Sequence, residues 1–596
     1  MVQIKEKHSG ILWMLLRFMK WMIFTDPLRF FVVFGLRLFT GLVPAVKLVV
    51  ISKIIQQSIG IYQGAPVDRL LYWIALWAII ILFGHCFTLM ETLVTERLRQ
   101  EMEDSLLRQL HEKAYKLRLE VFERADLHDL LKRAKKMTEP GEFLNLLWMF
   151  FSLFSSSLTI ASVALVVGRW NIWLLIAILL TALPSPIAQF IQARSMYFVE
   201  RKQMSSERML QYVVRLLTSR TAAKELRTFN SAAWLIQKWE QTYWSVAKVL
   251  FRHSSAQYLT IGILSIIGVI GLMSGVTWAA WTVATGSLLA SQFGAMLYAL
   301  QSVREGVNSI VGKSGDFRKK LFMIGDLFEY LDLGPEEIKG DRKLLGLGDI
   351  RIENMSFHYP QRLEKSLNDI TLTIKEGERI AIIGGNGSGK TTLAKVLMGL
   401  YRPTEGTVDY GELNIVNIDT NDLTDQSAAV FQDFIRYAFT LKENIAYGRF
   451  NLMEDSSAIE EAAVLGGADE IVSALPDGYN TLLTREFSNG TELSGGQWQK
   501  VAISRAFMRK AKFIVLDEPT AALDPIAETA VFERFSSVAG TNTAILISHR
   551  LGMARLCDRV LVMNGGRIVE QGKHEELIGA GGEYAKMWKI QSQWYA

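Results

Sequence analysis

The segment Arg379-Ile-Ala-Ile-Ile-Gly-Gly-Asn-Gly-Ser-Gly-Lys-Thr-Thr, residues 379–392, decides the fold of the C-terminal half. Its first residues are apolar and β-branched, which predicts a buried strand that ends near Gly384. A helical stretch follows from Thr392 to Leu400, so the glycines lie between a strand end and a helix N-terminus. Backbone amides at that position face an anion, and glycine lets the backbone approach it closely. The complete G-x-x-x-x-G-K-[ST] pattern therefore predicts a phosphate-binding loop.

The residues of this loop have distinct expected contacts. Lys390 would reach the β- and γ-phosphates of a nucleotide, and the hydroxyl of Thr391 would help to hold Mg²⁺. ATP and Mg²⁺ are therefore the expected ligands. The expected nucleotide contacts are Gly384, Gly385, Asn386, Gly387, Ser388, Gly389, Lys390, Thr391 and Thr392.

Two further apolar strands bring reactive side chains to the same edge of the expected sheet. Phe513-Ile-Val-Leu-Asp-Glu ends in two carboxylates. This places Asp517 beside the metal ion and Glu518 where it could polarise a water that attacks the γ-phosphate. A third buried strand, Thr543-Ala-Ile-Leu-Ile-Ser, is followed by His549. A lone histidine there is more often structural, so the interpretation depends on the combination.

A second candidate anion site begins at Leu493-Ser-Gly-Gly-Gln. Ser494 is a typical helix N-cap residue, and the two glycines after it expose backbone amides at a helix N-terminus. As an isolated pentapeptide the segment could equally be an ordinary cap. One nucleotide does not obviously need two such anion-binding helix N-termini from one chain.

The N-terminal half differs in composition. Of the 596 residues 50% are hydrophobic and only 21% are charged, and the mean hydropathy is +0.18. Part of the chain is therefore expected in lipid. Uncharged stretches long enough to cross a bilayer occur only before about residue 305. Six membrane helices are predicted, at 30–58, 70–94, 144–168, 171–192, 257–278 and 282–303. A tight turn is expected between the last two, near Gly275 to Gly286.

Overall charge and cysteine content exclude several other classes. The chain has 65 basic and 60 acidic residues, and this balance of +5 gives no indication of a nucleic-acid partner. Two cysteines, Cys86 and Cys557, exclude a disulfide scaffold and a metal site built from cysteines.

Charged residues predict the orientation in the membrane. Basic residues gather in the N-terminal flank and beside two long loops, at about 95–143 and 193–256, whereas the short joints carry little charge. Because basic residues stay on the cytoplasmic side, both termini are predicted to be cytoplasmic. The long loops fit helical extensions of the membrane segments, in which Asp104 and Arg108 would pair on one face.

The apolar stretch Ile11–Phe24 precedes the first predicted membrane helix. Arg17 and Lys20 interrupt it and no cleavage site of small residues follows, so a cleaved signal is disfavoured. An amphipathic helix in the membrane interface is expected, and Pro27 would help to begin the next helix. An extension of the first membrane helix is the alternative.

The motifs follow one another in the order of an ABC-transporter ATPase. Walker A lies at 384–391, a glutamine stands in Val430-Phe-Gln-Asp, the LSGGQ signature lies at 493–497, Walker B lies at 513–518, and Ala522-Leu-Asp524 and His549 follow. With the preceding helices, the whole chain resembles an exporter-type ABC half-transporter. The resemblance implies a six-helix α-helical transmembrane domain and an α/β P-loop ABC ATPase domain with an antiparallel β subdomain. The expected parts are an elbow helix at 1–28, a transmembrane domain at 29–320, a linker at 321–345 and a nucleotide-binding domain at 346–596.

The same resemblance implies roles for single residues. Tyr359 would stack on adenine, Glu518 would be the catalytic base and His549 the γ-phosphate switch. Gln432 would sense the γ-phosphate and Mg²⁺, and Asp524 would contact the other subunit. The implied ligands of Mg²⁺ are Thr391, Gln432 and Asp517.

The resemblance further implies a dimer. Ser494, Gly495, Gly496 and Gln497 would close on the nucleotide held by the Walker A loop of a second subunit. A homodimer is consistent with the intact motifs, and a heterodimer stays open. Val121–Leu131 and Ala222–Phe229 look like the coupling helices that such exporters press against the ATPase, with a solvated helix as the plainer interpretation.

One segment departs from the family pattern. Many exporters carry T-E-V-G-E-R-G before the signature, whereas this chain has Thr484-Arg-Glu-Phe-Ser-Asn-Gly. Gly490 matches and the acidic positions do not, although Glu486 could serve. This variant and the residues around Gln432 are similar to bacterial lantibiotic and bacteriocin peptide exporters.

An exporter of peptides across the cytoplasmic membrane is thus the preferred interpretation. A lipid flippase or multidrug pump would share every ATPase residue. A DNA-remodelling ATPase with an LSGGQ-like signature would lack the membrane helices, and an importer usually keeps its two parts on separate chains. Charges inside membrane segments are candidate cargo contacts, namely Arg37, Lys47, His85 and Glu91.

Overall fold

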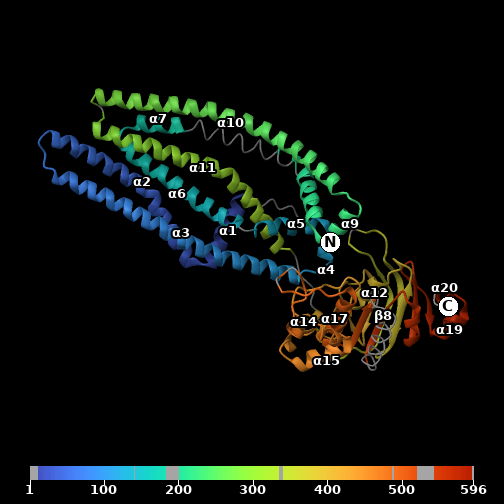
Figure 1. The fold of residues 1–596 in the computed structure, drawn as a ribbon. Helices are drawn as coiled ribbons and strands as arrows, with labels where there is room; N and C mark the ends of the chain where they lie inside the picture. The colour runs from blue at the N-terminus through green and yellow to red at the C-terminus, as the bar shows by residue number, and fades with distance from the viewer. Residues whose placement is uncertain are drawn as a thin grey trace. The chain divides into compact units, whose positions relative to one another are not determined.

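The computed structural model describes residues 11–593 except 140, 183–198, 200–201, 204, 287, 334–339, 361, 486, 488 and 520–541. The chain forms two compact units (Figure 1). One comprises Met1–Tyr115 with Asp129–Leu333, and the other comprises Lys116–His128 with Gly334–Ala596. The short segment Lys116–His128 therefore belongs to the C-terminal unit although the sequence places it between membrane helices.

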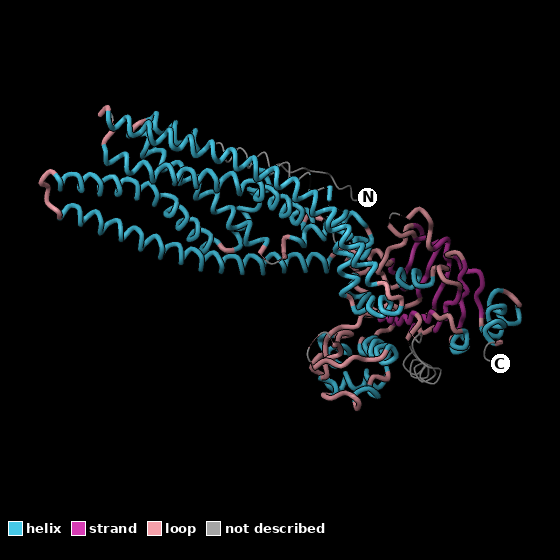
Figure 2. Tube along the Cα trace, turned by 45° about the horizontal axis from the view of Figure 1, so that its top comes forward, coloured by secondary structure: helices cyan, strands magenta, loops and turns pink. Residues whose placement is uncertain are grey.

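The first unit is helical (Figure 2). Six helices correspond to the six predicted membrane segments, and they are α2 (Pro27–Tyr62), α3 (Asp68–Lys116), α6 (Glu142–Trp170), α7 (Ile172–Ala182), α10 (Ala232–Ala284) and α11 (Ala290–Leu331). By length and composition α2, α3, α6 and α10 can cross a membrane. Residues 183–192 of the fourth predicted segment lie outside the described part of the chain.

Several helices are longer than the apolar segments that predicted them. The segment expected to end at 94 continues as helix to Lys116, and α10 begins at Ala232 instead of 257. Charged pairs one turn apart stabilise the extension of α3. Arg99 pairs with Glu96 and Glu103, and Arg108 pairs with Asp104 at 3.2 Å, as predicted.

The turn between the last two membrane helices lies at the C-terminal end of the predicted interval Gly275–Gly286. Helix α10 runs to Ala284, beyond the expected helix end at 278, and α11 begins at Ala290. Gly286, with φ +75°, provides the left-handed conformation that the turn requires. At its other end α11 continues to Leu331, so helix occupies the first part of the segment 321–345 that was expected as a linker.

The N-terminal helix is separate from the first membrane helix. Helix α1 (Ile11–Thr25) ends one residue before the N-cap Asp26, whose side chain accepts from the backbone N–H of Arg29 at 3.1 Å, and Pro27 opens α2. The alternative of one continuous helix is therefore wrong. Short helices α5 (Ala125–Lys136) and α9 (Arg220–Thr228) complete the elements around the long loops.

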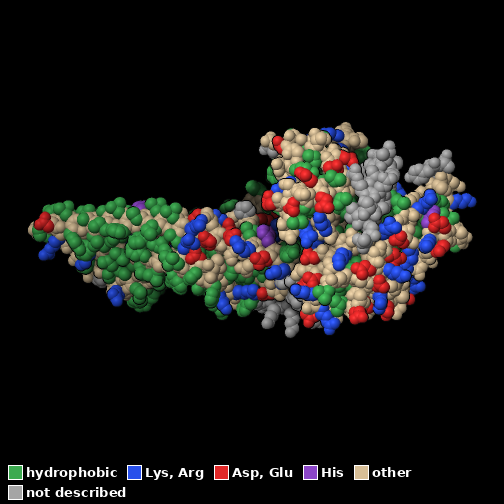
Figure 3. Space-filling model, turned by 90° about the horizontal axis from the view of Figure 1, so that it is seen from below, with side chains coloured by type: hydrophobic (Ala, Val, Ile, Leu, Met, Phe, Trp, Pro, Cys, Tyr) green, Lys and Arg blue, Asp and Glu red, His purple; other side chains and the backbone are tan. Residues whose placement is uncertain are grey.

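The interior of the helical unit is formed by five of the six long helices. Buried side chains of α2, α6, α7, α10 and α11 make one apolar cluster that includes Leu48, Val163, Ala295 and Val303. In contrast, the apolar stretch of α3 is not buried at all in the described chain. Hydrophobic side chains gather over these helices in Figure 3, which is the surface expected of a lipid-facing unit.

The second unit contains two sheets. The smaller has the order β2–β1–β4–β5 and is antiparallel, with β1 (Ile350–Phe357), β2 (Leu367–Ile374), β4 (Glu405–Tyr410) and β5 (Leu413–Asn414). The larger has the order β10–β9–β3–β8–β7–β6 and is parallel except for its last hairpin. Its strands are β3 (Arg379–Gly384), β6 (Ser427–Val430), β7 (Phe513–Asp517), β8 (Thr543–Ile547), β9 (Arg559–Asn564) and β10 (Arg567–Gly572).

Apolar cores join these sheets to the helices. One core fills the space between the sheets and α12 (Lys390–Leu397), and another packs α17 (Gly495–Met508) against β6, β7 and β8. A separate core lies among the helices inserted between β6 and β7. The other helical elements are α4 (Leu119–Glu123), α13 (Thr420–Asp425), α14 (Leu441–Ala446), η1 (Phe450–Leu452), α15 (Ser456–Gly466), α16 (Asp469–Val472), η2 (Gly478–Asn480), η4 (Leu551–Leu556), α19 (His574–Ala580) and α20 (Glu583–Ser592).

Candidate active site

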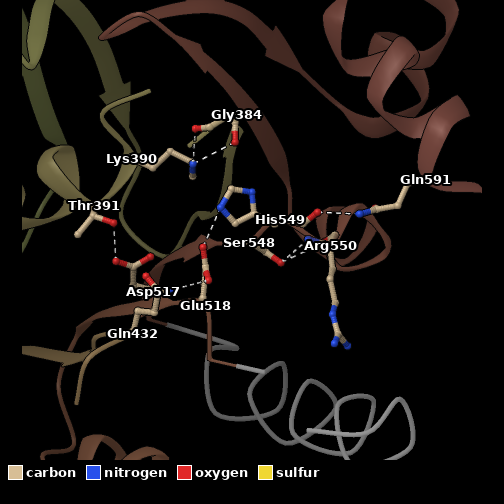
Figure 4. A network of polar contacts seen from close by, with 11 residues as sticks. Gly384, Lys390, Thr391, Gln432, Asp517, Glu518, Ser548, His549, Arg550 and Gln591 are labelled. Carbon is tan, nitrogen blue, oxygen red and sulfur yellow. Dashed lines mark hydrogen bonds and ion pairs between the residues drawn. The ribbon is translucent and has the colours of Figure 1, made fainter. Parts of the chain in front are cut away.

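The order of the parallel strands brings the predicted motifs together. Strand β8 lies between β3 and β7, with Ile382 opposite Ile547 and Asp517 opposite Ile547. The carboxyl ends of three adjacent parallel strands therefore meet at one edge of the sheet, where open α/β sheets bind ligands. The phosphate loop, the two carboxylates and His549 leave the sheet at that edge (Figure 4).

The phosphate loop is closely packed against the sheet on one side. A Cβ on Gly384, which has φ +156°, would lie 2.2 Å from the carbonyl oxygen of Met563, so no larger residue fits. The ammonium of Lys390 donates to the carbonyl oxygens of Gly384 at 3.0 Å and Gly385 at 2.9 Å. Burial lowers the pKa of Lys390, and the nearby carboxylates of Glu518 and Asp517 oppose that shift.

The loop fits a bound phosphate group. The hydroxyl of Ser388 is buried and has no hydrogen-bond partner among the described residues, although a buried polar group normally has one. The Lys390 ammonium bonds to neutral carbonyls in the phosphate loop. Both groups are donors suited to phosphate oxygens at a helix N-terminus, since α12 begins at Lys390.

Two of the three expected metal ligands, Thr391 and Asp517, lie side by side. The hydroxyl of Thr391 donates to a carboxylate oxygen of Asp517 at 2.7 Å. Asp517 is only 2% exposed, and this burial raises the pKa of its carboxyl group. In the described residues no group of three His, Cys, Asp or Glu side chains can hold a metal. A hydroxyl and one carboxylate suit Mg²⁺, which takes few protein ligands and completes its shell with phosphates and water.

Glu518 has an unusual backbone conformation. Its φ is +51°, in the left-handed region that few non-glycine residues adopt, and its N–H donates to the carbonyl of Ile547 at 2.9 Å. Such conformations are concentrated at functional sites. The strained turn directs the carboxylate away from the strand end, toward the segments that follow β6 and β8.

Two predicted residues hold the Glu518 carboxylate from either side. Gln432 donates from Nε2 to one oxygen at 2.8 Å, and Nε2 of His549 lies 2.8 Å from the other (Figure 4). Gln432 and His549 follow β6 and β8, so both neighbours of β7 contribute a partner. The three side chains expected to act on the γ-phosphate and the attacking water thus form one hydrogen-bonded group.

The signature segment forms the helix N-terminus that its sequence predicts. Ser494 is the N-cap of α17, its hydroxyl accepts from the N–H of Gln497 at 3.3 Å, and the Gln497 side chain accepts from the N–H of Ser494 at 2.9 Å. This capping box leaves the amides of Gly495 and Gly496 in the first turn. The segment therefore has the local geometry of an anion-binding helix end.

Tyr359 lies in an aromatic cluster next to the phosphate loop. Its ring is edge-on to those of Phe357 at 5.1 Å and Tyr401 at 5.4 Å, and its hydroxyl lies 3.1 Å from the hydroxyl of Thr392. The predicted adenine-binding residue and the phosphate loop are thus directly connected.

Two residues of this unit, Tyr401 and Arg505, make contacts that the sequence does not predict. Tyr401 is 1% exposed, and its hydroxyl donates to the carboxylate of Glu123 at the end of α4. The first predicted coupling segment, Val121–Leu131, is divided between α4 and α5, because the backbone is extended at Arg124. Arg505 in α17 donates to the carbonyls of Ile435 and Asn444 and lies over the ring of Tyr437 at 4.7 Å. Arg505 thereby ties the signature helix to the segment that follows Gln432.

Some predicted positions cannot be placed. Asp524 lies outside the described residues, as does Glu486 in the variant segment 484–490. Their roles therefore stay predictions.

The four candidate cargo contacts differ in their surroundings. Arg37 of α2 pairs with the buried Glu91 of α3, and its guanidinium lies 5.1 Å from the ring centre of Trp148. Lys47 is half-buried and His85 is exposed, and within the described chain neither forms an ion pair. Arg37 and Glu91 therefore neutralise each other, which leaves Lys47 and His85 as the unpaired candidates.

Comparison with known proteins gives a consistent result. Residues 367–521 match the ABC transporter domain family. The subtilin transport ATP-binding protein SpaT of Bacillus subtilis is 29% identical over 92% of this chain and 89% of its own length. The nisin transport ATP-binding protein NisT of Lactococcus lactis subsp. lactis is 27% identical over 90% of each chain.

Lipid flippases and a solved exporter are also similar. The ATP-dependent lipid A-core flippase of Alkalilimnicola ehrlichii is 30% identical over 62% of each chain. The structure of a bacterial Atm1-family ABC exporter with ATP bound has a TM-score of 0.76 and 22% identity, and the match covers 95% of this chain and 99% of that one. The fold of the whole described chain is therefore that of an ABC exporter subunit.

Proposed function

We propose that this exporter-type ABC half-transporter, a membrane protein that hydrolyses ATP, exports a peptide of the lantibiotic or bacteriocin kind across the cytoplasmic membrane. The choice of a peptide cargo rests on the share of this chain that each relative matches. SpaT and NisT match 92% and 90% of the chain, helical unit included, whereas the flippase of A. ehrlichii matches 62%. In this proposal the membrane helices recognise the cargo. A match that includes these helices therefore supports a shared cargo class more strongly than a match of the ATPase unit alone.

In the proposed ATP site each residue has a role that follows from its position. Lys390 and the loop amides bind the β- and γ-phosphates, and Tyr359 stacks on adenine. Thr391, Asp517 and Gln432 would hold Mg²⁺, and the bound ion would neutralise charge that develops on the phosphates. Glu518 accepts a proton from the attacking water, while Gln432 and His549 orient its carboxylate.

A second copy of the chain would complete each ATP site. The unit offers two helix N-termini with the geometry of anion sites, at Lys390 and at Gly495. One nucleotide held by the first leaves the second available for the nucleotide of a partner subunit. The intact set of motifs is consistent with a homodimer that has two working sites, and a related but different partner chain is the alternative.

Export would proceed by alternating access. ATP between two closed ATPase units makes phosphate contacts that exist only in the closed state, and release of the γ-phosphate removes them. Within the C-terminal unit, the contact of Tyr401 with α4 would connect the nucleotide site to the segment of chain that directly follows α3. Both termini and the ATPase unit would lie on the cytoplasmic side.

The peptide proposal can be tested by cargo stimulation. ATP hydrolysis of the purified protein in proteoliposomes would be measured with a leader-bearing lantibiotic precursor peptide, with lipid A and with neither. The proposal predicts stimulation by the peptide and none by lipid A. Stimulation by lipid A alone would support the flippase alternative and contradict the peptide assignment.

A further inference from the structure

Gln591 of the C-terminal helix α20 binds the backbone that directly follows the His549 side chain, on both sides of Arg550. Its Nε2 donates to the carbonyl oxygen of His549 at 2.8 Å, and its Oε1 accepts from the N–H of Leu551 at 2.7 Å (Figure 4). A single side-chain amide therefore satisfies an acceptor and a donor of the same loop. These two contacts lie 40 and 42 residues away from Gln591 along the chain.

The loop held in this way is very short. Strand β8 ends at Ile547 and the turn η4 begins at Leu551, so only residues 548–550 connect them. The hydroxyl of Ser548 accepts from the N–H of Arg550 at 2.9 Å, which fixes the first half of the loop from within. Gln591 fixes the second half from another element.

The His549 side chain itself is weakly held. It is 41% exposed, and it contacts Glu518 through Nε2. A cavity of about 350 Å³, lined by Gly384, His549, Gln591 and apolar side chains of α20, adjoins it. Since the imidazole is this exposed within the described part of the chain, its direction depends on the backbone that carries it, and Gln591 holds that backbone.

We infer that Gln591 is a positioning residue for ATP hydrolysis, which acts through the His549 backbone and keeps the imidazole directed at Glu518. This inference rests on the proposed role of His549. The amide suits the task because it offers one donor and one acceptor in a fixed plane, which match the carbonyl and N–H of the loop.

Two substitutions test the donor and the whole contact. Gln591→Glu keeps the shape and an acceptor for Leu551, but an oxygen replaces the nitrogen that faces the His549 carbonyl. Gln591→Met keeps the length and removes both hydrogen bonds. Gln593→Glu is the matched control, because Gln593 is exposed near the end of the same helix.

Steady-state ATPase kinetics of the full-length protein would be measured together with nucleotide binding. We expect kcat to fall about tenfold in both Gln591 variants, which corresponds to the loss of one or two hydrogen bonds. KM for ATP and the affinity for a fluorescent ATP analogue should stay within about twofold of the wild type. Gln593→Glu should match the wild type. An unchanged kcat in both Gln591 variants overturns the inference, and so does a parallel loss of kcat, nucleotide affinity and melting temperature.

A double-mutant comparison separates this inference from the role of His549. His549→Ala alone should lower kcat, and adding Gln591→Met should lower it no further, because Gln591 would then have no imidazole to position. An additive further loss overturns the inference and leaves the role of His549 intact. A wild-type kcat in His549→Ala overturns the role of His549, and the inference about Gln591 with it.

Discussion

Substitution of Tyr401 by phenylalanine isolates the contact between the ATPase core and α4. The change removes one hydroxyl and keeps the ring that packs on Phe357 and Tyr359. Burial and the adjacent Glu123 carboxylate raise the pKa of Tyr401, so the hydroxyl keeps its proton and is the donor.

The size of the effect follows from the surroundings of the two partners. A hydrogen bond to a charged group contributes about 1.5–3 kcal/mol. Glu123 is exposed and regains water when the hydroxyl is removed, so the lower end of that range applies. A loss of about 1.4 kcal/mol corresponds to a tenfold change in the equilibrium between docked and undocked α4.

Hydrogen exchange of the full-length protein measures this equilibrium directly. In Tyr401→Phe the amides of α4 should exchange about tenfold faster than in the wild type, because local opening becomes more frequent. Tyr410→Phe is the control, since Tyr410 is also buried and loses a bond to the carbonyl of Leu397, away from α4. Equal exchange of α4 in the wild type and both variants would refute the reasoning.

Three other substitutions give distinct outcomes. Glu518→Gln should retain ATP binding and lower ATP turnover about 10²–10⁴-fold, as for loss of a general base; wild-type turnover would show that the base is another residue. Asp517→Asn should abolish Mg²⁺-dependent turnover. It should also raise the melting temperature without nucleotide at neutral pH, because burial raises the pKa of Asp517 and its ionised form destabilises the fold. An unchanged or lower melting temperature contradicts this. Glu91→Met should destabilise the protein in detergent by about 3 kcal/mol, since it leaves the half-buried Arg37 without its partner. The double variant with Arg37→Met should recover most of the loss, and an additive loss would disprove this.

The features that the sequence predicts well are those that local pattern decides. The phosphate loop and the cap at Ser494 depend on residues within one turn or one strand of each other. The meeting of Thr391 with Asp517 and of Gln432 with Glu518 also follows, because adjacent parallel strands carry motifs to a common edge.

The sequence predicts that membrane helices extend into the long loops, as α3 and α10 do, but it does not predict where these extensions end. Hydropathy marks only the part of a helix that crosses lipid, whereas α3 and α10 continue as charged helices stabilised by pairs such as Arg108 with Asp104. Their ends depend on solvent and tertiary contacts rather than on apolar content.

Contacts between distant segments leave no local signal. Tyr401 and Glu123 are separated by 278 positions and Arg37 and Glu91 by a membrane hairpin, so neither pairing is visible in the sequence. Gln591 stands in an ordinary helix, and only the fold shows that its amide holds the loop of His549.

Peptide transport itself tests the central claim most directly. A fluorescent leader-bearing lantibiotic precursor would be offered to inside-out membrane vesicles that contain either the wild-type protein or Glu518→Gln, with and without ATP. The account predicts accumulation inside the vesicles only with the wild-type protein and only with ATP. Equal accumulation with Glu518→Gln, or none with the wild type in the presence of ATP, would contradict it.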